Sequence, residues 1–410
     1  MAGNAEIVVV GAGVAGASMA ITLARRGVSV LVLEKSLVHV DRIRGESLVP
    51  WGVAEARALG ILEVLLAAGG HFASRFVMYG EGVPPEVARA RALDLSTLVS
   101  HVAGNLKIGH PQMCQALNDT AVAAGAALFR GISDLHVTPG KPPTVSFVHE
   151  SQRYELSPRL VVGADGRGSS VARQIGAHVQ TDPVHHLMAG LLVERVAEWP
   201  MEDMTIGTEG DGTFYIFPQS ESRMRLYLCY ALDQRRRFAG PDRVQNFQHA
   251  FRLSSVPQGE MLAAARPAGP CQGYPNADTW IDRPMAPGVV LVGDAAGHND
   301  PVIGQGLAIA LRDVRLVGDA LTEPGPWTEE VFVPYAEERR ARMRRLRLYA
   351  HQFSKFRCEY TEQARARRRT AFSRILADPS VALPFLVPLK GPNALPDHAY
   401  EPSAWSRMFD

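Results

Sequence analysis

The stretch that decides the fold runs from Val289 to Asp313 and reads VVLVGDAAGHNDPVIGQGLAIALRD. Its first four residues are apolar, which predicts a short buried strand. The strand ends at Gly293-Asp294, and an irregular Gly, Asn, Asp and Pro segment leads to a helix that we expect to begin near Gly304. A carboxylate accepts hydrogen bonds from hydroxyls, and free N–H groups at a helix start stabilise an anion. The stretch therefore indicates a ligand with hydroxyls and negative charge, although acidic loops before helices are also common.

A second stretch near the N-terminus indicates the same kind of ligand. Residues 7–10 are a β-branched run that predicts a buried strand, and a GxGxxG motif follows at residues 11–16. Residues 17–26 are typical of a helix, and a second strand at residues 28–33 ends at Glu34. Strand, glycine motif, helix, strand and acid in this order form a dinucleotide-binding fingerprint, whereas the motif alone would be a weak signal.

Each residue of the fingerprint has a physical role. Gly11 makes the tight turn, Gly13 lets the backbone approach a pyrophosphate, and Gly16 lets helix and strand pack closely. Glu34 is placed to accept hydrogen bonds from ribose hydroxyls. An acid at this position favours an unphosphorylated ribose, so the expected ligand is FAD or NAD rather than NADP. A glycine-rich turn without a ligand is the alternative.

A third stretch repeats the pattern of a strand that ends at an acid. The apolar run at residues 160–162 leads through Gly163 to Asp165-Gly166, and a short helix is expected to follow. By itself this is also what an ordinary strand–helix connection looks like. Two acid-tipped strands together with the glycine motif make a shared ligand site the better interpretation.

The composition excludes several classes of function. The chain has 410 residues, 46% of them hydrophobic and 21% charged, and a net charge of +1, so nucleic acid is not expected as a partner. Its four cysteines have no paired spacing, so we expect neither a metal site nor a disulfide framework, and a reducing, cytoplasmic setting. Residues 7–24 are uncharged, but they contain the glycine motif and follow no basic leader, so we expect neither stable membrane insertion nor cleavage.

The rest of the chain gives coarser predictions. Residues 213–218 and 224–230 are expected to be two strands, whose aromatic residues Tyr215, Phe217 and Tyr227 are either core or one wall of an apolar pocket. Helices are expected at 51–66, 111–124 and 335–376, and short strands between 72 and 104.

The C-terminal region is unusually rich in arginine and then in proline. Six arginines fall between residues 339 and 347, which suggests nucleic acid or a membrane surface. The better interpretation is a helix that docks through Met343, Leu346, Ala350 and Phe353 and leaves its basic face in solvent. The proline-rich segment from residue 379 to residue 402 is expected to be an extended tail.

Taken together, the three motifs resemble the flavin-dependent aromatic hydroxylases of the para-hydroxybenzoate hydroxylase type over most of residues 5–350. The resemblance implies an α/β fold with a Rossmann-like FAD-binding domain of the para-hydroxybenzoate hydroxylase and glutathione reductase type, an inserted β-sheet-rich substrate domain and C-terminal helices. The expected FAD-binding domain is discontinuous and comprises residues 1–74, 105–185 and 270–335. Residues 75–104 and 186–269 would form the substrate domain, and residues 336–410 a helical segment and tail.

The resemblance also implies the residues that contact FAD. Glu34 would hold the adenosine ribose, Asp294 the ribityl chain, and Arg44 would face the diphosphate. Asp165 would belong to a segment that serves both FAD and the nicotinamide cofactor. His110 stands where the family often has a flavin-contacting arginine, and the arginine after the Asp-Gly motif comes one place later than usual, at Arg173. The full set expected at the cofactor is Gly11, Gly13, Ala15, Gly16, Glu34, Lys35, Arg42, Arg44, Ser47, His110, Asp165, Gly166, Gly293, Asp294, Pro301, Gly304, Gln305, Gly306 and Leu307.

The activity implied by the resemblance is a monooxygenase reaction in which NADPH or NADH reduces FAD and O2 reacts through a flavin C4a-hydroperoxide. The product would be a hydroxylated or epoxidised aromatic or apolar small molecule. His298 and His110 are weak candidates for a base, and each is equally well a structural histidine. Flavin halogenases share the fold and a Gly-Glu-Ser segment similar to residues 45–47, but their Trp-x-Trp-x-Ile-Pro motif is absent. Prenyl-chain reductases are a further alternative, and a non-catalytic binding protein is the least favoured because all three flavin motifs are intact.

Overall fold

The computed structural model describes residues 5–41, 43, 45–196, 199–322 and 325–409. One half of the molecule is built on a six-stranded sheet with the strand order β21-β22-β12-β1-β2-β8. All neighbouring strands are parallel except β21, which is antiparallel to β22. The strands are β1 (Ile7–Val10), β2 (Val30–Glu34), β8 (Ala127–Arg130), β12 (Leu160–Gly163), β21 (Met285–Ala286) and β22 (Val289–Leu291).

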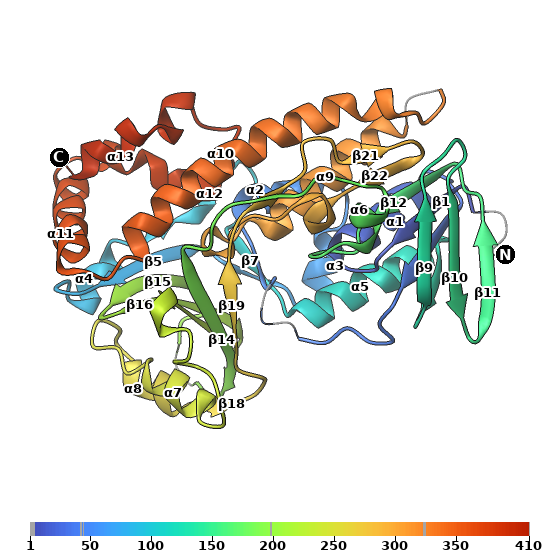
Figure 1. The fold of residues 1–410 in the computed structure, drawn as a ribbon. Helices are drawn as coiled ribbons and strands as arrows, with labels where there is room; N and C mark the ends of the chain where they lie inside the picture. Colours follow the sequence, from blue (N-terminus) through green and yellow to red (C-terminus); the bar gives the residue numbers. More distant parts are fainter. Residues whose placement is uncertain (1–4, 42, 44, 197–198, 323–324, 410) are drawn as a thin grey trace.

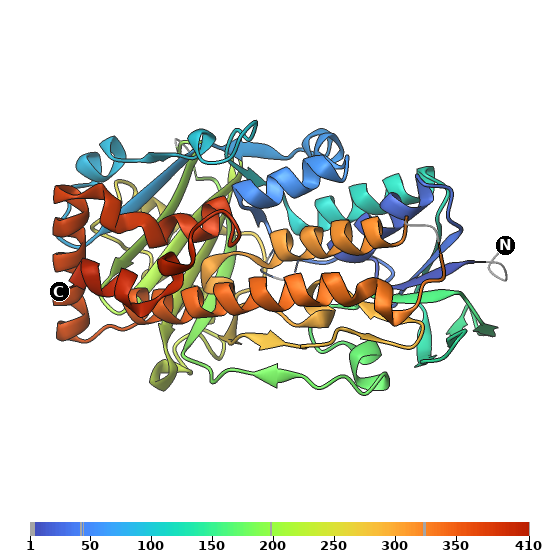
Figure 2. The ribbon, with the colours of Figure 1, turned by 90° about the horizontal axis from the view of Figure 1, so that it is seen from above.

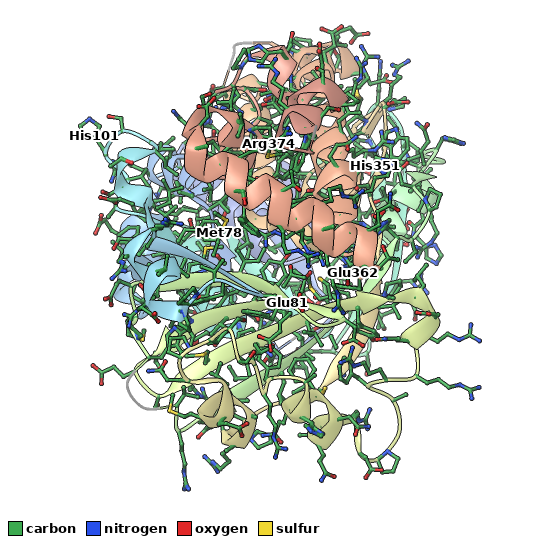
Figure 3. The ribbon with its side chains drawn as sticks, turned by 90° about the vertical axis from the view of Figure 1, so that its left-hand side faces the viewer. Met78, Glu81, His101, His351, Glu362 and Arg374 are labelled. Atoms are coloured by element: carbon green, nitrogen blue, oxygen red, sulfur yellow. The ribbon has the colours of Figure 1, made fainter. Side chains whose placement is uncertain are left out.

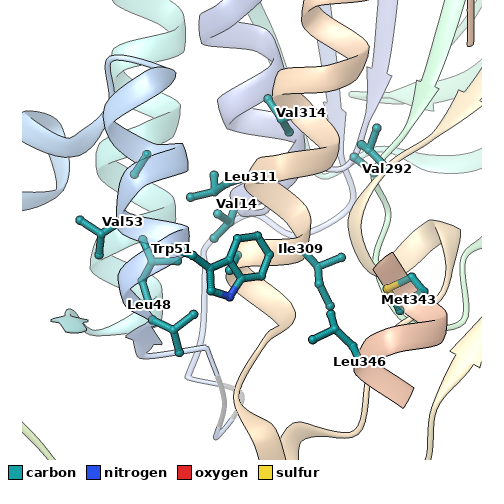
Figure 4. Packing of buried hydrophobic residues seen from close by; sticks show 14 of the residues in the cluster. Val14, Leu48, Trp51, Val53, Val292, Ile309, Leu311, Val314, Met343 and Leu346 are labelled. Atoms are coloured by element: carbon teal, nitrogen blue, oxygen red, sulfur yellow. The ribbon is translucent and has the colours of Figure 1, made fainter. Parts of the chain in front are cut away.

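Helices cover the six-stranded sheet, as expected for parallel strands whose residues are apolar throughout. Helices α1 (Val14–Ala24) and α9 (Gly306–Ala320) pack against each other, and α5 (His110–Ala123) packs on α1. Figure 4 shows α9 at the centre of the packing, where Ile309 and Leu311 lie among the side chains of Val14 and Trp51. Helices α2 (Pro50–Ala58) and α3 (Leu62–Ala67) belong to the same hydrophobic core, whereas α6 (Ser170–Gln174) belongs to the core on the opposite face of the sheet.

The second large sheet has eight strands and forms the other half of the molecule, beside the half built from the six-stranded sheet and its helices (Figure 1). The order β18-β14-β17-β16-β15-β5-β6 contains a parallel pair, β5 with β15, between otherwise antiparallel neighbours, and β19 pairs with β14. Two short helices, α7 (Arg243–His249) and α8 (Gly259–Ala264), lie near one another, and α4 (Pro85–Ala90) follows β5. The strands are β5 (Arg75–Gly80), β6 (Leu93–Asp94), β14 (His186–Glu194), β15 (Asp203–Glu209), β16 (Gly212–Ser220), β17 (Arg223–Ala231), β18 (Arg266–Pro267) and β19 (Gln272–Asn276).

Three small sheets complete the strands. They are β9 (Ser133–Thr138), β10 (Thr144–His149) and β11 (Gln152–Leu156); β3 (Ser47–Leu48), β7 (Asn105–Lys107) and β4 (His71–Ala73); and β13 (Gln180–Thr181) with β20 (Thr279–Trp280). Short 3₁₀ helices occupy Leu95–Thr97, Leu232–Gln234, Gly293–Ala296, Pro301–Ile303 and Glu329–Phe332.

The described part of the C-terminal region is largely helical. The helix α10 (Val333–Arg357) runs along both halves of the molecule (Figures 1 and 2). Helices α11 (Glu362–Ala377), α12 (Val387–Lys390) and α13 (Pro402–Phe409) follow, with 3₁₀ turns at Pro379–Leu386 and Asp397–Tyr400. The prediction of an extended tail over residues 379–402 is therefore wrong: helical turns occupy much of it, and Val387, Ala399 and Tyr400 are buried, because α12 packs on α2 and the turn at Asp397–Tyr400 packs on α13.

No single described helix is long and apolar enough to cross a membrane. One bent pair of helical segments, residues 362–375 and 380–390 at an angle of 114°, passes that test by length and composition alone.

Candidate functional site

A cavity of about 690 Å³ lies between the two halves of the molecule. The ends of β1, β2 and β12 line one part of it, and β16 and β17 of the eight-stranded sheet line another. The helix α10 contributes Tyr349, Phe353 and Arg357 to the lining. A crevice at the carboxyl ends of parallel strands is where α/β proteins bind their ligands.

The start of α1 opens into this cavity. Its N-terminal N–H groups have no side-chain cap, because Gly13 is the residue before the helix. Gly11 has a φ of +101°, and a Cβ there would lie 2.4 Å from the carbonyl oxygen of Ala164. A Cβ on Gly16 would lie 1.8 Å from the carbonyl oxygen of Gly11, whereas one on Gly13 would meet no atom within 4 Å. Gly11 and Gly16 are therefore required for packing, and Gly13 faces open space at the cavity.

Glu34 lies at the end of β2 and lines the same part of the cavity. Its two carboxylate oxygens accept hydrogen bonds from the backbone N–H groups of Ala12 and Ser36, both at 2.8 Å. Burial alone would raise the pKa of Glu34, but these hydrogen bonds outweigh burial and lower it. Glu34 is thus an ionised acceptor held in place by the backbone of the glycine loop.

The two other acids that end strands are used differently. Asp165 accepts hydrogen bonds from the backbone and side chains at the start of α6, from Ser169 Oγ at 2.5 Å and Ser170 N at 2.6 Å. Asp294 lies beyond β22 and forms an ion pair with Arg167, whose Nε is 3.3 Å from Asp294 Oδ2. All of these residues except Ser169 line the cavity. Arg167 is therefore a site residue that the sequence did not predict.

The start of α9 is the second helix terminus at the cavity. Gly304 adopts the left-handed conformation with a φ of +65°, and α9 begins two residues later without a side-chain cap. The Gln305 side chain is fully buried and accepts a hydrogen bond from Trp51 Nε1 at 2.8 Å. Pro301, Leu307 and the residues between them line the cavity, so uncapped N–H groups are available to an anionic part of a ligand.

A buried ion cluster on α10 fixes the turn before α9. Arg339 donates to Asp313 at 2.9 Å, to the carbonyl oxygens of Ala296 and Gly297 at 2.8 Å, and to that of Gly293 at 3.2 Å. Asp313 also accepts from Arg342 at 2.6 Å and from the backbone N–H of Gly293 at 2.9 Å. Burial alone would raise the pKa of Asp313, but the two arginines outweigh burial and lower it.

This cluster corrects the interpretation of the arginine-rich segment. Met343 and Leu346 are buried as predicted, but Arg339 and Arg342 are only 2% and 1% exposed. They lie on the docked side of the helix, and the solvated basic face is reduced to residues such as Arg340. The physical reason is Asp313, a buried carboxylate on another helix that compensates their charge.

Aromatic side chains of the eight-stranded sheet form an apolar wall of the cavity. Tyr215, Phe217 and Tyr227 all line it, and the two tyrosines are tied by hydrogen bonds at their hydroxyls. Tyr215 donates to the carbonyl oxygen of Val302 at 2.7 Å, and Tyr227 donates to Glu46 at 2.6 Å. The eight-stranded sheet is thereby attached directly to the segment that precedes α9.

A buried lysine that the sequence did not single out lies behind this wall. Lys107 is fully buried, its Nζ is 2.6 Å from Ser47 Oγ, and it lies 3.8 Å from the ring centroid of Phe217. Burial lowers the pKa of Lys107 to about 7, against the opposing effect of the nearby carboxylate of Glu46. Because Ser47 and Phe217 line the cavity, a group that gains and loses a proton near neutral pH lies directly behind it.

Most of the residues expected at the cofactor lie together. The cavity lining contains Gly11, Gly13, Ala15, Glu34, Lys35, Ser47, His110, Asp165, Gly166, Asp294, Pro301, Gly304, Gln305, Gly306 and Leu307. It does not contain Gly16, Gly293 or His298. Gly293 binds Asp313 through its N–H, and the ring of His298 lies 2.8 Å from Thr279 Oγ1. Arg42 and Arg44 lie outside the described residues.

Three residues far apart in the sequence form a separate buried group. The ligand atoms of His186, Cys229 and Cys358 lie within 4.8 Å of one another, a spacing that would also suit a metal ion. Burial opposes ionisation of both partners, yet the pKa of Cys358 is lowered by its hydrogen bonds to Cys229 and His186, and that of His186 is raised to about 9. The thiolate of Cys358 and the imidazolium of His186 thus carry opposite charges.

The cavity fits a dinucleotide that carries a flat ring system. Two uncapped helix starts face it, Glu34 offers an ionised acceptor at its β2 end, and an aromatic wall lines another side. The open space at Gly13, which any larger residue would begin to fill, is what a pyrophosphate needs for close approach to the backbone.

Comparisons with known proteins show the family of this chain. Residues 4–347 match the FAD binding domain family. Squalene monooxygenase SE1 of Panax ginseng is 25% identical over 326 residues, which is 78% of this chain and 59% of that protein. The chain thus spans less than two thirds of the length of this relative.

Two solved structures have the same fold. The p-nitrophenol 4-monooxygenase PnpA of Pseudomonas putida has a TM-score of 0.80 at 17% identity, covering 94% of this chain and 98% of that one. PqsL of P. aeruginosa in complex with 2-aminobenzoylacetate has a TM-score of 0.72 at 23% identity, covering 88% of this chain and 98% of that one.

Proposed function

This chain belongs to the FAD binding domain family, and on that premise we propose that it is a monooxygenase that uses NADPH or NADH and O2 to hydroxylate or epoxidise an apolar or aromatic small molecule. The observation that supports this most directly is the shared cavity. Gly11, Gly13 and Glu34 of the dinucleotide fingerprint and the aromatic wall of the eight-stranded sheet line one continuous space. A cofactor and a flat substrate therefore have room to meet there.

The proposal gives each part of the cavity a role in holding FAD. Glu34 accepts hydrogen bonds from the adenosine ribose, and the start of α1 at Gly13 faces the pyrophosphate. Asp294, oriented by Arg167, accepts from the ribityl hydroxyls. The uncapped N–H groups at the start of α9 stabilise negative charge on the flavin ring.

When bound and reduced, FAD supplies the chemistry that activates O2 and transfers one oxygen atom. The side chains of this protein prepare the environment for that chemistry. Tyr215, Phe217 and Tyr227 exclude water from the substrate side. Lys107 holds a proton on Nζ at 2.6 Å from Ser47 Oγ and can release it near neutral pH. His110 lines the cavity and remains a candidate base, whereas His298 lies outside the lining.

The substrate class is supported by the wall and by the relatives. A wall of aromatic rings favours a flat, apolar substrate. The sequence relative squalene monooxygenase SE1 is named for an apolar substrate, and the two proteins with this fold, p-nitrophenol 4-monooxygenase and PqsL with 2-aminobenzoylacetate, are named with aromatic compounds. We further propose that the FAD-binding part comprises residues 1–74, 105–185 and 270–335, with residues 75–104 and 186–269 as the substrate part, and that the protein acts in the cytoplasm.

The test is an anaerobic reduction experiment with the purified flavoprotein. NADPH and then NADH are mixed with it in the absence of oxygen, and the visible absorbance of the flavin is followed with and without aromatic candidates. We expect rapid bleaching that a true substrate accelerates, and a product that contains one more oxygen atom when air is admitted. Bound flavin that neither nucleotide bleaches would refute the self-sufficient monooxygenase, and halide incorporation with a separate reductase would identify a halogenase instead.

A further inference from the structure

Arg357 is the last residue of α10, and its guanidinium has no carboxylate partner among the described residues; the thiolate of Cys358 acts on it as a nearby charge but accepts no hydrogen bond from it. The residue is 1% exposed and lines the cavity. No carboxylate of the described residues forms an ion pair with it. Its Nε and Nη1 have no hydrogen-bond acceptor, and Nη2 reaches only the weak acceptor Met78 Sδ at 3.4 Å. Every other arginine of α10 that is as deeply buried, Arg339 and Arg342, has a carboxylate partner.

The position of Arg357 is fixed by the structure around it. Its carbonyl oxygen accepts a hydrogen bond from Thr213 Oγ1 of β16 at 2.5 Å, which anchors the end of α10 to the eight-stranded sheet. The helix α11 then crosses this end of the molecule, in the foreground of Figure 3 between Glu362 and Arg374. The guanidinium is therefore enclosed on the solvent side and open only to the cavity.

Aromatic rings offset only part of the cost of burying this charge. The guanidinium carbon lies 5.2 Å from the ring centroid of Phe356, 5.5 Å from that of Phe372 and 6.0 Å from that of Phe353. Such contacts attract the cation but leave its N–H groups without acceptors. Burial lowers the pKa of Arg357 only to about 10, so the group is charged at neutral pH. A buried cation of this kind is normally matched by an anion.

A second unpaired polar group lies on the same face of the helix. Tyr349, Phe353 and Arg357 are four residues apart along α10, a spacing that places them on one side. The hydroxyl of Tyr349 is buried and has no hydrogen-bond partner. This face of α10 therefore brings to the cavity lining the N–H groups of Arg357 and the hydroxyl of Tyr349, with the ring of Phe353 between them in the sequence.

We propose that Arg357 binds a carboxylate of the substrate, with the Tyr349 hydroxyl as an additional donor. The substrate is then a flat or apolar acid rather than a hydrocarbon, with its apolar part against the aromatic wall. This inference rests on the proposed function for the identity of the site, but binding of the acid requires neither reduction of the flavin nor O2.

The test measures binding of matched acids and esters to the flavin-loaded protein by calorimetry. The probes are benzoate and 2-aminobenzoate, each with its methyl ester. A charge-assisted pair of hydrogen bonds predicts that the acids bind about 10- to 100-fold more tightly than the esters. Arg357→Met removes this preference, Arg357→Lys keeps part of it, and Arg369→Met, which changes an exposed arginine of α11, leaves it unchanged.

Thermal unfolding separates substrate recognition from a purely structural role. Without ligand, Arg357→Met should have a melting temperature equal to or above that of the unmodified protein, because it removes a buried charge that has no carboxylate partner. Benzoate should raise the melting temperature of the unmodified protein and not that of the variant. Absence of acid binding, equal affinity for acid and ester, or a variant that melts several degrees lower without ligand would each overturn the proposal. If the acids bind as expected but neither NADPH nor NADH reduces the flavin, only the proposed monooxygenase activity is rejected.

Discussion

Replacement of Arg339 by Met should destabilise the protein and weaken flavin binding at the same time. Arg339 is the donor for three carbonyl oxygens of the turn at residues 293–297 and one partner of Asp313. Leaving three buried acceptors without a donor costs roughly 1 kcal/mol each, or about 3 kcal/mol in total. Arg342 remains 2.6 Å from Asp313 and still compensates its charge, so the loss should stay near the lower end of the roughly 3–5 kcal/mol typical of a broken buried pair.

The assay is denaturant unfolding of the flavin-free protein, followed by titration of the folded variant with FAD. Arg340→Met is the matched control, because the neighbouring arginine is exposed on the same helix and its removal should change stability by no more than about 0.5 kcal/mol. FAD affinity of Arg339→Met should fall at least tenfold, since the unsupported turn contains the cavity residue Asp294. A variant that unfolds within about 1 kcal/mol of the control, with unchanged FAD affinity, would refute the assigned role.

Three further predictions concern the cavity. Gly11→Ala should prevent folding, because it combines a positive φ with a clash at 2.4 Å, whereas Gly13→Ala should fold normally and bind FAD more weakly; circular dichroism and FAD titration distinguish the two, and equal behaviour would contradict the different roles. Glu34→Ala should reduce FAD affinity by about tenfold or more, as expected for loss of charge-assisted hydrogen bonds, with a smaller effect of Glu34→Gln. The pKa of Lys107 is about 7 in the folded protein and 10.5 ordinarily, so this residue makes the free energy of unfolding rise with pH between these values. Denaturant unfolding of Lys107→Met at several pH values should lack that rise. An identical pH dependence in the variant and the unmodified protein would show that the pKa of the lysine is not lowered.

The local elements of the cofactor half could be predicted from the sequence because each is a short-range pattern. The strands β1, β12 and β22 are continuous apolar runs that end at a glycine motif or an acid, and each forms where expected. The pairing of β5 with β15 could not be predicted, since it joins segments that are more than a hundred residues apart. The proline content of residues 379–402 favours an extended segment, whereas burial of Val387 in α12 depends on α2, which is distant in the sequence.

The site shows the same division between local and distant information. Glu34 and Asp294 follow from motifs that contain them, but the sequence does not predict the burial of Arg339, because nothing near it reveals the buried carboxylate of Asp313. Lys107 and Arg357 stand in no motif at all. Their importance comes from burial and from the partners they have or lack, which only the folded arrangement supplies.

The strand order of the six-stranded sheet has a consequence for synthesis of the protein. The central strand β1 emerges first from the ribosome, but its neighbour β12 is made after residue 160 and β22 only after residue 289. A nascent chain that has reached β12 has the glycine motif but lacks α9 and the arginine of α10 that supports the turn before it. If these residues hold FAD as proposed, cofactor capture is a late event, and we expect the yellow colour of bound flavin only in chains that extend through α10.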